Sequence, residues 1–225
     1  MRSWMAGAVL VVSLLATVPL AGQEEQGELV TRQGAAGLRA ERFTRSGDRL
    51  HGEVMTALGE QLSFEASLRP DGTVASLDAF VWPQGINSST GLRHVQIEFA
   101  DKGARLQVSD VGPTLSREFA APAGTIPVIS GDLVLVELLL RRARAAGAQT
   151  VQLPVLSLDL ARLTTATVTF TGDSADVRIE GRPELLRFRT DAAGHLLGGA
   201  DDAAGLTIFR IGRPAETAAA ATKQQ

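Results

Sequence analysis

The chain has 225 residues, of which 44% are hydrophobic and 21% charged, and it contains no cysteine. This length and apolar share suit a globular fold whose core needs no disulfide or metal to hold it, while the lack of cysteine excludes thiol nucleophiles, cysteine-bound zinc and iron–sulfur clusters. The 22 basic and 25 acidic side chains are not gathered into blocks and leave a formal net charge of −3. We therefore expect no nucleic acid partner, because binding a phosphate backbone requires a basic surface.

The N-terminal segment is typical of a sequence that directs export. Arg2 is the only charged residue before Glu24, and residues 5–20 are almost entirely apolar. A basic residue ahead of an apolar run is the pattern of a secretory signal, but the small residues that a signal peptidase requires are poorly placed. Two interpretations stay open: residues 1–22 are a cleaved signal peptide, or residues 4–21 are an uncleaved membrane anchor. Both predict an extracytoplasmic, periplasmic protein of the cell envelope.

The composition divides the remaining chain into three parts. Residues 23–40 are expected to be a linker that leads from the membrane to the first strand. Residues 41–212 are expected to form a β-rich domain. Residues 213–225 contain four consecutive alanines and few large side chains, which favours a disordered tail.

Alternating apolar and polar residues predict a sheet over most of the domain. Residues 62–69 alternate strictly, and the turn at 70–72, Pro-Asp-Gly, leads into a second apolar run at 73–82. The same two-strand pattern recurs at 94–108 and at 165–180. Further strands are expected at 49–56, 151–158, 184–190 and 206–211. The fold class is therefore mainly β, a curved antiparallel meander in the form of a half-barrel or a sandwich.

One segment departs from this pattern and predicts a helix packed against the sheet. Residues 133–140 are apolar on nearly all sides, and the helix is expected to run to about residue 146. Either Ser130 or Asp132 could cap its N-terminus, and Gly147 would end it. Together with the N-terminal apolar helix, this completes the expected secondary structure.

The apolar surface of this helix has to be covered by something. Burial against the sheet is one interpretation, and contact with a lipid or a protein partner is the other. Under the second interpretation, the candidate partner or ligand contacts are Leu133, Val136, Leu139 and Leu140.

No catalytic, cofactor-binding or metal-binding residues can be identified from motifs. His51 and Glu53 would share one face of a strand and could supply two metal ligands, but no third ligand is visible. His94 and His195 are expected to face solvent. The chain has no G-x-S-x-G elbow, no P-loop and no G-x-G-x-x-G loop, so we expect neither a cofactor nor an enzymatic activity.

Six degenerate segments carry a resemblance to bacterial secreted or periplasmic β-rich domains of unknown function. These segments are residues 41–43, 50–54, 70–72, 133–140, 151–155 and 191–196. Such domains are similar to lipoprotein-carrier-like half-barrels. The resemblance implies a curved antiparallel sheet with a helix across its concave side, and a hydrophobic ligand or a partner in place of a reaction.

Three functional hypotheses follow. The first is a non-catalytic structural or interaction subunit docked on a membrane or envelope protein complex. The alternative is a periplasmic carrier of a lipid or another hydrophobic ligand. A hydrolase stays open as a third, because a site assembled from distant residues leaves no trace in the sequence.

Overall fold

The computed structural model describes residues 24–82, 92–110, 112–129, 131–201 and 204–212, and these parts form one 15-stranded sheet and a single helix. The strands are β1 (Glu25–Gln33), β2 (Ala36–Ser46), β3 (Arg49–Thr56), β4 (Gly59–Leu68), β5 (Val74–Val81), β6 (Arg93–Ala100), β7 (Gly103–Ser109), β8 (Leu115–Phe119), β9 (Ile126–Val128), β10 (Thr150–Ser157), β11 (Arg162–Thr171), β12 (Ser174–Ile179), β13 (Leu185–Thr190), β14 (Leu196–Asp201) and β15 (Leu206–Ile211). The helix is α1 (Leu133–Ala145). The fold is therefore mainly β, as the alternating patterns predict.

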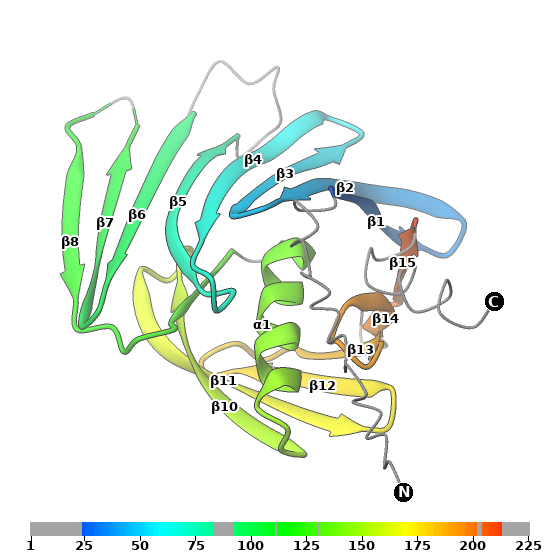
Figure 1. Ribbon diagram of the computed structural model, residues 1–225. Coiled ribbons are helices and arrows are strands. Elements are labelled where there is room, and N and C mark those ends of the chain that lie inside the picture. The colour runs from blue at the N-terminus through cyan, green and yellow to red at the C-terminus, as the bar shows by residue number, and fades with distance from the viewer. Residues whose placement is uncertain (1–23, 83–91, 111, 130, 202–203, 213–225) are drawn as a thin grey trace, which may run out of the picture.

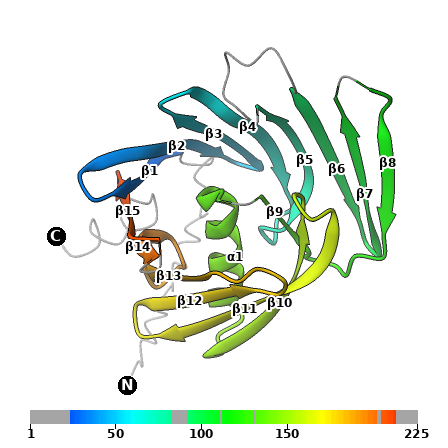
Figure 2. The same cartoon turned by 180° about the vertical axis from the view of Figure 1, so that it is seen from behind.

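The sheet consists of two meanders that meet at β1 and β15. Its strand order is β8-β7-β6-β5-β4-β3-β2-β1-β15-β14-β13-β12-β11-β10-β9. All neighbours are antiparallel except β9 and β10, which run parallel. The sheet curves around α1, so that the helix lies between the wall formed by the first strands and the wall formed by β10 to β13 (Figures 1 and 2).

The N-terminal and C-terminal predictions fall partly outside the described residues. The signal peptide or anchor at 1–22, with its apolar helix, lies there, and so does the tail at 213–225. Among the residues that are described, no helix combines the length and the apolarity needed to cross a membrane.

The predicted linker at residues 23–40 is wrong, because β1 and the first part of β2 occupy this range. β1 pairs with both β2 and β15 and so joins the two meanders. Its inward-facing residues include Glu25 and Thr31 beside Leu29, and all three are buried. Since two of the three are polar, the strand lacks the apolar alternation on which a sequence prediction depends.

Three further strands were not expected, each for a physical reason. β8 is an edge strand with mostly exposed side chains, and β9 has only three residues. β14 contains Gly198 and Gly199, which weaken its β pattern. A Cβ added at Gly199 would lie 2.7 Å from the backbone oxygen of Arg187, so the close approach of β13 requires glycine there.

The helix agrees with its sequence prediction in extent and in capping. The Asp132 side chain accepts a hydrogen bond from Leu135 N at 2.7 Å, which identifies Asp132 as the N-cap. The candidate contacts Leu133, Val136, Leu139 and Leu140 are all buried in the core that the helix shares with the sheet. The interpretation of a helix covered by its own sheet is therefore confirmed, and a contact of these four residues with a partner or a ligand stays a prediction.

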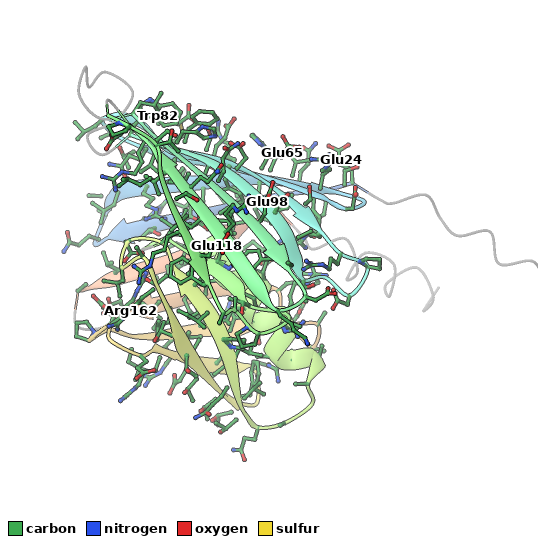
Figure 3. All side chains as sticks on the ribbon, turned by 90° about the vertical axis from the view of Figure 1, so that its left-hand side faces the viewer. Glu24, Glu65, Trp82, Glu98, Glu118 and Arg162 are labelled. Atoms are coloured by element: carbon green, nitrogen blue, oxygen red, sulfur yellow. The ribbon has the colours of Figure 1, made fainter. Side chains whose placement is uncertain are left out.

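The outer face of the first meander is polar. Glu65 on β4, Glu98 on β6 and Glu118 on β8 are exposed there (Figure 3). Their neighbours Phe64, on β4, and Ile97, on β6, are buried on the opposite face, as the two-residue period of a strand requires.

Candidate functional site

A cavity of about 830 Å³ lies next to the C-terminal half of α1. The turn between β2 and β3 contributes Gly47 and Asp48 to its wall, and the turn between β4 and β5 contributes residues 70–72. The second turn lies close to α1 (Figure 1). Ala193, which precedes β14, completes the rim. The cavity therefore lies where the helix meets turns from both meanders.

Basic side chains outnumber acidic ones on the cavity wall. Its four arginines and two aspartates define what we call the arginine cavity: Arg45, Arg69, Arg141, Arg142, Asp48 and Asp71. A guanidinium group is planar and permanently charged, and it binds carboxylate or phosphate through paired hydrogen bonds. The arginine cavity is therefore suited to an anionic group.

The chain itself fixes Arg69 at this wall. Its Nη1 donates to the carbonyl oxygen of Val74 at 2.8 Å, and its Nη2 donates to the carbonyl oxygen of Phe99 at 2.5 Å. The nearby Asp71 accepts hydrogen bonds from the backbone and the hydroxyl of Thr73. These hydrogen bonds, together with the charges of Arg142 and Arg69, lower the pKa of Asp71, so that this carboxyl is ionised at neutral pH.

Behind the cavity lies a buried ion-pair network formed by Glu25, Arg45, Glu137 and Arg210. Arg45 Nη1 lies 2.7 Å from Glu25 Oε2, and Arg210 Nη2 lies 2.6 Å from Glu25 Oε1. Arg210 also pairs with Glu137, and Arg45 Nη2 lies 3.6 Å from Glu137 Oε1. The exposed fractions of the four side chains lie between 1% and 11%. Each charge of the network therefore has an opposite charge beside it, which offsets the cost of burying it.

The network connects the cavity wall to the rest of the fold. Glu137 Oε2 accepts a hydrogen bond from Leu196 N at 2.9 Å, which links α1 to β14. Arg141 Nη1 lies 4.0 Å from Glu25 Oε2. Arg45 belongs both to the network and to the cavity wall. Two guanidinium groups of the arginine cavity, those of Arg45 and Arg141, thus lie beside glutamates of the network that holds α1 against β1, β2 and β15.

Two buried carboxyl groups, those of Glu41 and Asp132, lie at the N-terminus of α1. Glu41 Oε2 accepts hydrogen bonds from Leu133 N at 2.7 Å and Val134 N at 3.3 Å, and Glu41 also pairs with Arg39. Burial raises the pKa of Glu41 to about 8, against the lowering effect of Arg39. Burial likewise raises the pKa of the N-cap Asp132 to about 6. The pair therefore retains protons that the unfolded chain would release.

This pair makes the stability of the protein pH-dependent. A carboxyl group with a raised pKa in the folded state favours folding most below its ordinary pKa, and this contribution is lost as the pH rises. We expect the free energy of unfolding to fall as the pH rises from about 4.5, the ordinary value for Glu41, to about 8, its value in the fold. In urea titrations across this range, Glu41→Gln should flatten the decline. The exposed control Glu65→Gln should leave it unchanged, and equal slopes for all three proteins would contradict the assignment.

His51 lies on β3 and His94 on β6. His51 Nε2 lies 3.2 Å from Glu53 Oε1, so these residues share an exposed face. Among the described residues, no three metal-ligating side chains come together, and the pair gains no third ligand there. His94 is half-buried: its Nε2 lies 2.8 Å from Asp78 Oδ1, and its ring stacks on Phe80 with 4.5 Å between centroids.

The prediction that His195 faces solvent is wrong. Its side chain is 1% exposed, and its Nδ1 lies 2.7 Å from Asp191 Oδ2. The turn that carries it packs tightly on the helix, since a Cβ added at Gly194 would lie 2.7 Å from the Cα of Arg141. A glycine-containing turn suggests an exposed position, and only the packing of this turn against α1 shows otherwise.

No sequence pattern predicts the arginine cavity. Its four arginines come from β2, from the residue that follows β4 and from α1, so no linear motif joins them. The one sequence feature that points to the cavity is the adjacent pair Arg141 and Arg142, near the end of an otherwise apolar helix. That pair also fits the ordinary preference for basic residues near a helix C-terminus.

The fold and this cavity define a mainly β protein whose curved sheet surrounds one helix and presents an arginine-lined hollow. No protein family model and no curated protein matches the chain. Among solved structures, it is similar to a β-barrel-like protein of the domain of unknown function DUF1849 from Brucella abortus. That similarity has 13% sequence identity and a TM-score of 0.46, and it covers 83% of this chain and 93% of that chain. A similarity to lipoprotein-carrier-like half-barrels stays a prediction.

Proposed function

We propose that the chain is a non-catalytic extracytoplasmic interaction subunit that docks on a membrane or envelope protein complex. The observation that carries this proposal is the filled interior of the curved sheet. Leu135, Leu139 and Leu140 of α1 have no exposed surface, and they belong to one core with both walls of the sheet. With its interior occupied by its own helix, the protein has to act through its surface.

The buried histidine supports a binding role over a hydrolytic one. His195 and Asp191 form the acid–histidine pair that a general base would need. With 1% of its side chain exposed, however, His195 is out of reach of a substrate at the surface.

The second candidate, a carrier of a lipid or another hydrophobic ligand, has one observation in its favour. The arginine cavity also contains apolar residues, namely Leu68, Leu138 and Leu153. A ligand with an acidic head and a short apolar part could bind there. A long apolar ligand between sheet and helix would first have to displace α1, at the cost of the buried leucine contacts.

The size of the native particle tests the proposed function. We expect the chain, extracted from host membranes in mild detergent, to migrate in an assembly well above its own mass of 23.7 kDa. Mass spectrometry of that assembly should identify at least one other envelope protein in constant proportion. A particle that contains this chain alone would contradict the proposal, and a co-purifying lipid would then favour the carrier.

A further inference from the structure

We propose that the partner docks in the arginine cavity and that the occupant is an acidic peptide segment with at least one apolar side chain. This inference rests on the proposed function, because it names the site and the chemistry of the docking. Its first support is the charge of the wall, where four arginines face two aspartates. Carboxylates of a partner would find paired donors there.

The second support is that the arginines are held in place before a ligand arrives. Arg69 is tied to two backbone carbonyls, and Arg45 is tied to Glu25 and Glu137. Side chains that are already ordered lose little conformational entropy on binding. Arg45 and Arg210 together balance Glu25 and Glu137. The other three arginines of the wall still outnumber its two aspartates, so the cavity keeps a net positive charge.

The third support concerns the shape of the cavity and favours a peptide over a membrane lipid. The cavity volume of about 830 Å³ lies within the roughly 300–1,000 Å³ typical of ligand pockets. Its apolar lining is short, and the helix residues behind it are fully buried in the core. A long acyl chain would therefore have to displace these helix residues, whereas a leucine side chain could pack against Leu138 and Leu153.

Binding of a defined probe to the full chain in mild detergent tests this inference. The probe is a short fluorescein-labelled peptide of alternating glutamate and leucine, followed by fluorescence anisotropy. We expect Arg141→Gln and Arg142→Gln each to weaken binding by about tenfold, which corresponds to a lost charged contact. Arg105→Gln is the matched control, since Arg105 is exposed on β7 and pairs with Glu118 outside the cavity.

A gain-of-function variant separates a binding effect from misfolding. Asp48 lies on the cavity wall, and Asp48→Asn removes one of its two negative charges. We expect this variant to bind the peptide several-fold more tightly, with a stronger dependence on salt, because the attraction that salt screens has grown. A damaged fold would not produce tighter binding.

Several results would overturn the inference. These are equal binding of the peptide to the arginine variants, equal binding of a glutamine–leucine peptide, and cavity-dependent binding of phosphatidylglycerol vesicles in place of the peptide. Loss of peptide binding to the arginine variants together with a native particle of this chain alone would instead contradict the proposed function. A native assembly that persists in Arg142→Gln would contradict the inference and leave the proposed function standing.

Discussion

Replacing Glu137 by alanine is expected to lower the free energy of unfolding by about 3–5 kcal/mol, the cost of breaking a buried ion pair by removing one partner. The substitution leaves Arg210, whose side chain is 2% exposed, with Glu25 as its remaining acidic partner. It also leaves Leu196 N without the hydrogen bond that it donates to Glu137. Urea denaturation followed by circular dichroism measures the loss.

The exposed pair Arg49 and Glu65 supplies the control for this prediction. Its two atoms lie 2.9 Å apart, but the side chains are 60% and 56% exposed. Glu65→Ala should therefore cost no more than about 1 kcal/mol. In the double variant Glu137→Ala, Arg210→Ala, the loss should be smaller than the sum of the single losses, because no lone charge remains. Similar small losses for Glu137→Ala and Glu65→Ala would show that the network does not hold α1 in the sheet.

Replacing Gly194 by alanine is expected to cost about 3 kcal/mol, from two sources. Its φ is +89°, a left-handed conformation that costs an L-residue about 1–2 kcal/mol. The added Cβ would also lie 2.7 Å from Arg141 Cα and 2.9 Å from the carbonyl oxygen of Leu140, and overpacking adds about 1–3 kcal/mol. The overlapping atoms are backbone, which cannot rotate away.

A substitution at Gly147 measures the conformational cost separately from the cost of overpacking. Its φ is +70°, and a Cβ added there would meet nothing within 4 Å. Gly147→Ala should therefore show the conformational cost alone, about 1–2 kcal/mol. If Gly147→Ala and Gly194→Ala lose the same stability in urea titrations, then the turn before β14 does not pack on α1 as tightly as the distances indicate.

The sequence predicted those elements in which one face is apolar and the other polar. β3 and β4 alternate between buried and exposed residues, and the strand predictions at these positions agree with the structure. The helix was equally clear, since a run of leucine and valine has to be buried on all sides. β1 was missed because Glu25, a charged residue, faces the core. Its burial is possible only because Arg45 and Arg210, distant in sequence, surround it.

The candidate site was beyond sequence analysis for a related reason. Arg45 lies on β2, Arg69 directly after β4 and Arg142 on α1, and only the curvature of the sheet around α1 brings them together. Each one alone resembles an ordinary exposed arginine. The same applies to His195, whose burial depends on the close contact between Gly194 and the helix backbone.

Site-specific photocrosslinking in living host cells tests the central claim, a protein partner seated in the arginine cavity, most directly. A photoreactive phenylalanine analogue would replace Ala145, which lines the cavity, or Ser116, which is exposed on β8 as the control. Irradiation should give one discrete protein adduct from position 145, no such adduct from position 116, and loss of the adduct when Arg142→Gln is added. Lipid adducts alone at position 145, or equal protein adducts from both positions, would contradict this account.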